Sequence, residues 1–212
     1  MKTQQNNPST RSRSLRMTEG VINDESILVI KSSELKLWQG LKTDSCDTLL
    51  NLINAKKEFH WRSIMETDEN YKQVIPYLIF QFQDLFFVMQ RKETASEQRL
   101  KNKLSIGIGG HIRKEDISSK SLFDWARREF AEEINYDGKF ETELIGALND
   151  DSNSVGKVHL GIVFLLKGDS DKIKVRSELK SGYLVKKEDL ETLVPKMETW
   201  SKIVSQYLIG FF

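Results

Sequence analysis

The feature that most constrains this chain is the run Arg-Glu-Phe-Ala-Glu-Glu at positions 128–133. On a helix its three glutamates lie at i, i+3 and i+4, where side chains are neighbours and like charges repel each other. They also lie toward the C-terminal end of the predicted helix, where the backbone dipole disfavours negative charge. A divalent cation would offset both effects. Mg²⁺ and Mn²⁺ prefer carboxylate oxygens, and Mg²⁺ sites usually also include substrate phosphates.

An apolar stripe at i, i+4 spacing predicts which side of this helix faces the core. Its members are Leu122, Ala126, Phe130 and Ile134, with Phe123 beside them. At about 100° per residue, Glu129 and Glu133 fall on the margin of that stripe. Most acidic strings of this kind form a solvated helix face. The projection favours a site at the edge of the core for this one.

A predicted strand at 104–108 ends in Gly109-Gly110 and precedes the acidic helix. The arrangement resembles the Nudix box, G-x5-E-x7-R-E-U-x-E-E-x-G-U, in which U is a bulky apolar residue. Gly110 matches the opening glycine, and the run at 128–133 matches the central part with Arg128, Glu129, Phe130, Glu132 and Glu133. The Gly-Gly-His-Ile version at 109–112 looks most like a group of predicted phosphoesterases.

The chain departs from the signature at three positions. Asn135 replaces the last glycine and Tyr136 fills the final apolar position. Asparagine also adopts the left-handed backbone conformation, so we expect the helix to end at Asn135. The first glutamate is ambiguous, because the loop is about four residues longer than the signature's. Counting forward from Gly110 gives Asp116, and counting back from Arg128 gives Lys120.

The resemblance implies a fold and a reaction. The fold is α+β, a Nudix-type α/β/α sandwich with a mixed sheet, here with an N-terminal extension. The reaction is hydrolysis of a diphosphate linked to another moiety, as in a nucleoside diphosphate-X compound, with Mg²⁺ or Mn²⁺ as cofactor. The substrate would be a small-molecule diphosphate. Its identity within that class is not encoded in any motif, and the choice of a nucleotide-type compound rests only on how common such substrates are in the family.

The resemblance also assigns roles to residues. Glu129, Glu132 and Glu133 would hold the metal, with Glu129 also acting on the attacking water. The backbone carbonyl of Gly109 would be a further ligand, since glycine lets the backbone approach an ion closely. Arg128 would orient the carboxylates through a bidentate ion pair.

Several other side chains are weaker candidates. Glu178 is the expected additional acid from a loop after the box, with Asp150 and Asp151 behind it. His111, Arg91 and Arg99 are candidates for binding substrate phosphates. Each of these residues is at least as well explained as a solvent-exposed or loop-lining side chain. His159 is interpreted as a satisfied histidine of the core or cleft wall, and Trp200 as a core anchor.

Composition excludes some partners and suggests a compartment. A formal net charge of +1 gives no electrostatic case for nucleic acid or membrane binding. Cys46 is the single cysteine, which excludes an internal disulfide and favours a reducing, cytoplasmic location. No secretory signal pattern and no apolar run of membrane-spanning length is present. A homodimer is expected on base rates alone.

The chain divides by composition into three parts. Residues 1–20 are basic and polar and are expected to be a disordered tail. Residues 21–70 are expected to form an extension packed on the core, supplying substrate contacts or a dimer surface, and 71–212 the Nudix domain. Strands are predicted at 26–30, 76–82, 85–91, 141–148, 157–166 and 182–185, and helices at 45–55, 187–194 and 197–208.

Two other functions compete with hydrolysis. The first is a non-catalytic Nudix module that binds a ligand and regulates a partner, although a pure binder has no need of three clustered carboxylates. The second is a relative of isopentenyl diphosphate isomerase, which shares the fold. That chemistry requires a cysteine near the site, and Cys46 lies outside the box.

Overall fold

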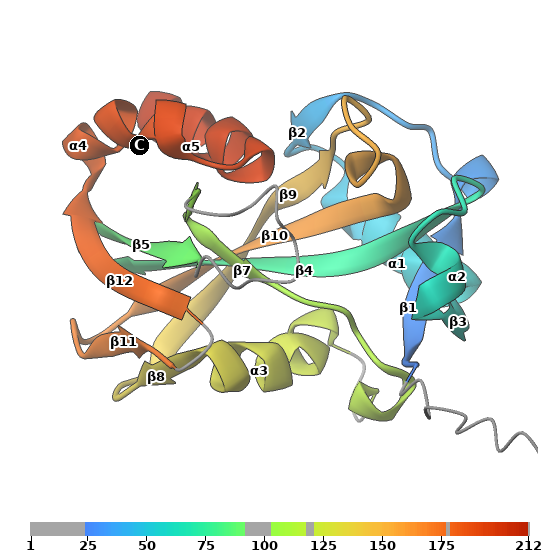
Figure 1. Ribbon diagram of the computed structural model, residues 1–212, viewed down its shortest axis with the longest axis horizontal. Coiled ribbons are helices and arrows are strands. Elements are labelled where there is room, and N and C mark those ends of the chain that lie inside the picture. Colours follow the sequence, from blue (N-terminus) through green and yellow to red (C-terminus); the bar gives the residue numbers. More distant parts are fainter. Residues whose placement is uncertain (1–23, 92–102, 118–120, 177–178, 212) are drawn as a thin grey trace, which may run out of the picture.

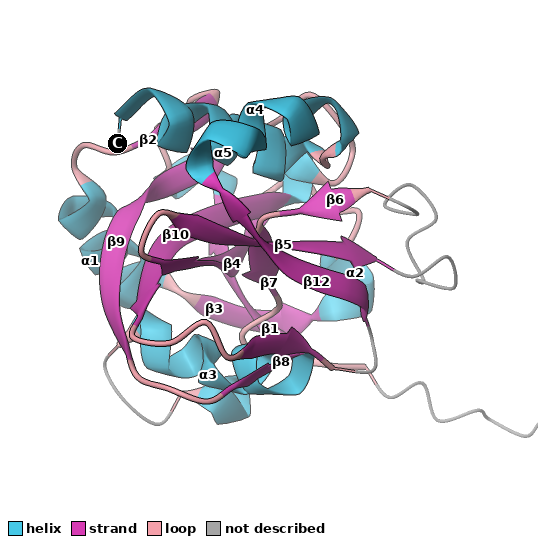
Figure 2. Ribbon diagram, turned by 90° about the vertical axis from the view of Figure 1, so that its left-hand side faces the viewer, coloured by secondary structure: helices cyan, strands magenta, loops and turns pink. Residues whose placement is uncertain are grey.

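The computed structural model describes residues 24–91, 103–117, 121–176 and 179–211. A mixed β-sheet lies between two helical layers (Figure 1). Helix α3 (Leu122–Glu133) covers one face, and α4 (Lys187–Leu193) and α5 (Thr199–Phe211) cover the other. Figure 2 shows the same layers after a 90° turn. The predicted α+β class and three-layer sandwich are confirmed.

The main sheet contains strands from the whole described chain. They are β1 (Ser26–Lys31), β2 (Gly40–Lys42), β3 (Glu58–Trp61), β4 (Tyr71–Phe82), β5 (Leu85–Arg91), β6 (Leu104–Ser105), β7 (Gly107–Gly109), β9 (Phe140–Asn149), β10 (His159–Gly168) and β12 (Leu179–Lys186). The strand order is β12-β5-β4-β10-β9-β2, and β4 and β10 pair in parallel. These two central strands are almost wholly buried, as expected for strands covered on both faces.

The region before residue 70 contributes strands to this sheet. Strand β1 pairs with β4 and with β3, and β2 pairs with β9. Helix α1 (Cys46–Lys56) contributes Ile53 to the same apolar core as α3, and a short helix, α2 (Arg62–Met65), follows β3. No helix in the described ranges is long and apolar enough to span a membrane.

Each face of the sheet has its own apolar core. The core on the α3 side includes Trp125 and Phe130, and the core on the other side includes Leu190, Val204 and Leu208. Trp200 packs against the second core as predicted, with its ring edge-on to that of Tyr77 at 5.6 Å between centroids.

Two sequence predictions about backbone are wrong. Pro76 was expected to begin a strand, but it lies inside β4. It falls between the end of the β1 pairing at Gln73 and the start of the β7 pairing at Tyr77, where a missing N–H costs no ladder hydrogen bond on that side. Asn135 is not a left-handed helix end. The chain passes from Glu133 straight into β8 (Ile134–Tyr136), which pairs with β11 (Ile173–Val175) and keeps Asn135 extended.

Candidate active site

Helix α3 starts and packs as its sequence predicts. The Ser121 hydroxyl caps it by accepting a hydrogen bond from the Asp124 N–H at 3.4 Å. The predicted apolar stripe is buried, and Trp125, 2% exposed, joins it. This anchoring leaves Glu129 and Glu133 half-buried at the margin and Glu132 exposed.

Arg128 is the centre of the polar side of this helix. Its Nη1 lies 2.8 Å from Glu129 Oε1 and 2.9 Å from Glu132 Oε2. Its Nη2 donates to the backbone carbonyl of His111 at 3.3 Å. One guanidinium therefore joins two acids of the motif to the loop that follows Gly109-Gly110.

Asp116 is the acid that pairs with Arg128. Arg128 Nε donates to Asp116 Oδ1 at 2.8 Å, and Nη2 donates to Oδ2 at 3.0 Å. The Asp116 side chain is 7% exposed and sits in the 3₁₀ turn Lys114–Asp116. Asp116, the residue reached by counting forward from Gly110, is therefore paired with the arginine of the acidic motif. Lys120, the other candidate, lies outside the described residues.

Gly110 lets Glu129 lie against the end of β7. A Cβ added at Gly110 would overlap the carboxyl group of Glu129, so another residue there would displace that side chain. A Cβ at Gly109 would approach Ile75 Cγ2 at 3.2 Å, closer than ordinary contact. Gly109 pairs with Tyr77 of β4 in the sheet, which fixes the place where the turn begins.

Burial and pairing act in opposite directions on the ionisable groups. The pair with Asp116 raises the pKa of Arg128 above its already high value. Partial burial works against ionisation of Asp116, but hydrogen bonds from Arg128 and the Arg113 N–H outweigh it and lower the Asp116 pKa. Burial raises the pKa of Glu129, partly offset by the charge of Arg128. Asp116 and Arg128 are thus held ionised as a pair.

Among the described residues, no group of three or more His, Cys, Asp or Glu side chains is arranged to hold a metal ion. Arg128 lies between two of the predicted ligands, Glu129 and Glu132. These two acids are adjacent, and both are turned toward its guanidinium. Glu178, the predicted extra ligand, lies outside the described ranges.

His111 follows the two glycines, and its ring is hydrogen-bonded within the protein. Its Nε2 lies 2.7 Å from Gln73 Oε1, and Gln73 Nε2 donates to the Met65 carbonyl at 3.0 Å. Burial, assisted by the nearby arginines, lowers the His111 pKa to about 3. With Gln73 Oε1 as acceptor, the neutral ring donates from Nε2, and Nδ1 has no proton to give to a phosphate.

The remaining candidates have varied placements. His159 is 8% exposed and bonds the Val155 carbonyl through Nδ1 at 2.7 Å, so it is a satisfied histidine as predicted. Arg91 ends β5, where its backbone pairs with Leu179. Arg99 lies outside the described residues. Cys46 is a free, half-buried cysteine.

Asp150 and Asp151 are engaged away from α3. Asp150 was expected to be solvated but is 1% exposed, and it accepts from Gln39 Nε2 at 2.7 Å. Asp151 accepts from Lys72 Nζ at 2.5 Å, and Lys72 is itself 1% exposed. A lysine inside an apolar strand carries no sequence signal that it will be buried and paired, so this network was missed.

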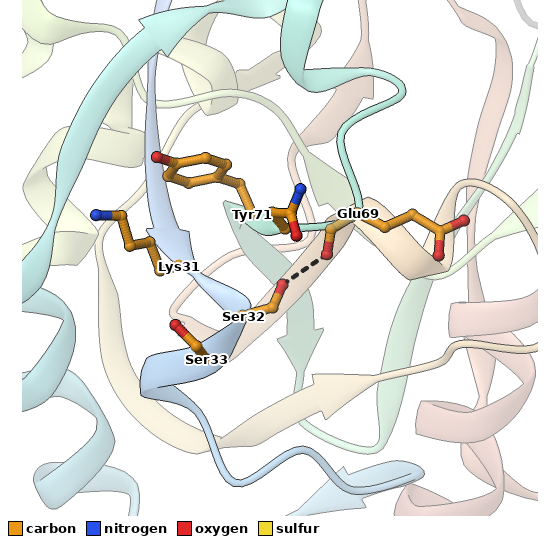
Figure 3. A pocket seen from close by; sticks show the side chains of 6 residues that line it. Lys31, Ser32, Ser33, Glu69 and Tyr71 are labelled. Atoms are coloured by element: carbon orange, nitrogen blue, oxygen red, sulfur yellow. Dashed lines mark hydrogen bonds between the residues drawn. The ribbon is translucent and has the colours of Figure 1, made fainter.

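A separate depression of about 190 Å³ lies where β1 ends and β4 begins (Figure 3). Ser32 donates to the Glu69 carbonyl at 2.9 Å across it. Its lining is Lys31, Ser32, Ser33, Glu69, Asn70 and Tyr71, none of which belongs to the acidic motif.

Two relatives cover nearly the whole chain. Protein YmaB of Bacillus subtilis (strain 168) is 33% identical over an alignment of 205 residues, and the match covers 87% of this chain and 98% of that protein. The crystal structure of Tm1382, a candidate Nudix hydrolase, is 31% identical with a TM-score of 0.76, covering 89% of this chain and 100% of that one. A match of this extent includes residues before position 71, so the similarity is wider than the motif region. No protein-family model matches the chain.

Proposed function

Because this chain belongs to the Nudix hydrolase superfamily, we propose that it hydrolyses a diphosphate linkage in a nucleoside diphosphate-X type compound with Mg²⁺ or Mn²⁺. The observation that supports this most is the convergence of Glu129 and Glu132 on one positive group beside the Gly109-Gly110 turn.

The donor set fits a hard divalent cation. The Arg128 Nη1 group acts as a stand-in, since carboxylate oxygens from two adjacent helical turns reach it at 2.8 and 2.9 Å. Carboxylate and carbonyl oxygens are the ligands that Mg²⁺ and Mn²⁺ prefer. We assign Glu129, Glu132, Glu133 and the Gly109 carbonyl to the cation, with Glu178 as an additional ligand.

Each residue has a separate part in the reaction. A bound divalent ion would neutralise phosphate charge and lower the pKa of a water molecule. We assign acceptance of the proton of the attacking water to Glu129, whose carboxyl group lies against Gly110. Arg128 keeps the carboxylates in register while Asp116 fixes its guanidinium. Arg91 and Arg99 remain candidates for binding substrate phosphates. His111 is hydrogen-bonded to Gln73, so we assign it the role of positioning the loop after the glycines.

Phosphate release from a panel of diphosphate compounds tests this function. Wild type is assayed with Mg²⁺, with Mn²⁺ and with a chelator, beside Glu133→Gln. We expect metal-dependent release that the substitution removes. Release that persists with chelator, or is equal in Glu133→Gln, would remove the acidic motif from the chemistry.

A ligand-binding module without catalysis is the second candidate. It is favoured by the pairing of the Arg128 guanidinium with both Glu129 and Glu132, because that pairing already compensates their charge. No release on the whole panel, together with a thermal shift by one of the same compounds in the presence of chelator, would select this function.

A further inference from the structure

We propose that Glu25, in the N-terminal region, is a positioning residue for the acidic motif, acting through Arg113 on the Asp116–Arg128 pair. The inference rests on the proposed function where it concerns turnover. Its structural part, the hold on Arg128, stands independently of catalysis.

Glu25 joins two elements that are far apart in the sequence. One carboxylate oxygen forms an ion pair with Arg113 Nη2, and the other lies 3.5 Å from Arg62 Nη1. The Glu25 side chain is 26% exposed, so solvent only partly screens these contacts. Its backbone carbonyl also accepts from the Arg62 N–H at 2.9 Å. Glu25 is therefore itself held in place by the start of α2.

The backbone beside Glu25 holds the same loop. Leu28 N–H donates to the Ile112 carbonyl at 2.8 Å, and Ile27 forms an isolated antiparallel bridge with Arg113. Ile112 is 1% exposed. The start of β1 thus forms a short strand-like contact with the segment directly after Gly109-Gly110.

From Arg113 the contacts continue to α3. The Arg113 N–H donates to Asp116 Oδ2 at 2.8 Å, the same oxygen that accepts from Arg128 Nη2 at 3.0 Å. Any movement of Arg113 would shift this shared acceptor. Because Arg128 in turn contacts Glu129 and Glu132, the shift would reach the proposed metal ligands.

The Arg113 side chain depends on its ion pair with Glu25 to keep its conformation. Within the described residues its Nε is buried without a hydrogen-bond partner, which is a cost that favours other rotamers. The ion pair with Glu25 at the far end of the guanidinium opposes that cost. The side chains of a catalytic site must stay within about 0.5 Å of their working positions. We therefore expect loss of the Glu25–Arg113 ion pair to displace the carboxylates of Glu129 and Glu132.

The direct test is the solvent exchange of the Arg128 Nε–H, measured by NMR on the full ¹⁵N-labelled chain. This proton lies in the hydrogen bond to Asp116 Oδ1, so its exchange reports opening of the pair. Glu25→Gln keeps the shape and removes the charge. We expect exchange about tenfold faster, the size of one weakened charge-assisted hydrogen bond. Glu34→Gln is the matched control, because it breaks an ion pair with Lys56 in the same region and should leave the exchange unchanged.

A second variant controls for misfolding of the first and tests whether Glu25 acts through Arg113. Arg113→Met is expected to give the same acceleration as Glu25→Gln, and the double variant no more than either alone, because both act through one path. Additive effects, or exchange equal to that of Glu34→Gln, would overturn the proposal.

Turnover supplies the functional readout. With a substrate found for wild type, Glu25→Gln should lower kcat about tenfold with KM little changed, as for outer-shell partners of metal ligands. If wild type hydrolyses nothing, the proposed function fails, but the Arg128 exchange still decides whether Glu25 positions the motif. A lower kcat without faster exchange would show that Glu25 acts by another route.

Discussion

Arg128 and Asp116 are joined by two parallel hydrogen bonds, from Nε to Oδ1 at 2.8 Å and from Nη2 to Oδ2 at 3.0 Å. The pair connects the segment that follows Gly109-Gly110 to the acidic helix.

Replacing Asp116 by Asn should destabilise the protein by about 2 kcal/mol, because the partly buried Arg128 loses its bidentate anionic partner and keeps only its contacts with Glu129 and Glu132. Urea unfolding at neutral pH measures this. Glu143→Gln is the control, since its pair with Lys167 is about half exposed and should contribute less than about 1 kcal/mol. Equal losses in the two variants would mean that the Asp116–Arg128 pair is no more than a surface contact.

Glu132→Gln should abolish most turnover with little change in stability. The Glu132 side chain is 52% exposed, so its charge contributes little to the free energy of folding. Binding of a divalent cation by Glu132, in contrast, depends on that negative charge. We expect turnover to fall at least about 100-fold and the melting temperature to stay within about 2 °C. A variant that hydrolyses at the wild-type rate would take Glu132 out of the mechanism.

Much of the fold could be predicted from the sequence because it depends on local residue patterns. The apolar stripe of α3 follows from its i, i+4 spacing, and the pairing of β4 with β5 follows from the two apolar runs predicted at 76–82 and 85–91. The placement of Glu129 at the core margin followed in the same way from helical geometry. These features depend on residues within a few positions of one another.

The features that escaped prediction depend on contacts distant in sequence. Asn135 is extended because β11, about 40 positions later, pairs with it. Lys72 is buried because Asp151 and the Gly156 carbonyl meet its ammonium group. The Glu25–Arg113 pair joins residues that no motif connects. Short strands such as β2 were missed because three residues carry too little periodicity to count.

Gly110→Ala should lower stability by less than about 1 kcal/mol, because the new methyl group meets the end of the flexible Glu129 side chain, which can move aside. It should also remove turnover, since Glu129 must move from its place. Gly210→Ala is the matched control: nothing lies within 4 Å of its added Cβ, and alanine is the better helix former in α5. We expect Gly210→Ala to raise the melting temperature slightly. Wild-type turnover in Gly110→Ala would show that the reaction does not depend on this position of the Glu129 carboxyl.

Acid should weaken the protein partly through Asp151. Burial works against its ionisation, but hydrogen bonds from Lys72 and Asn149 outweigh it, and the folded pKa is lowered. The unfolded chain, with an ordinary pKa of about 3.9, therefore binds the proton more readily. This stabilising contribution is complete above that value and is lost as the pH falls through the folded pKa.

The test compares wild type with Asp151→Asn by urea unfolding from pH 6 down to pH 3. At pH 6 the substitution should cost about 2 kcal/mol, because Lys72 is buried and loses its anionic partner while keeping the Gly156 carbonyl. The difference between the two proteins should shrink as the pH falls, since protonated Asp151 also carries no charge. A difference that stays constant across this range would mean that the charge on Asp151 does not contribute to stability.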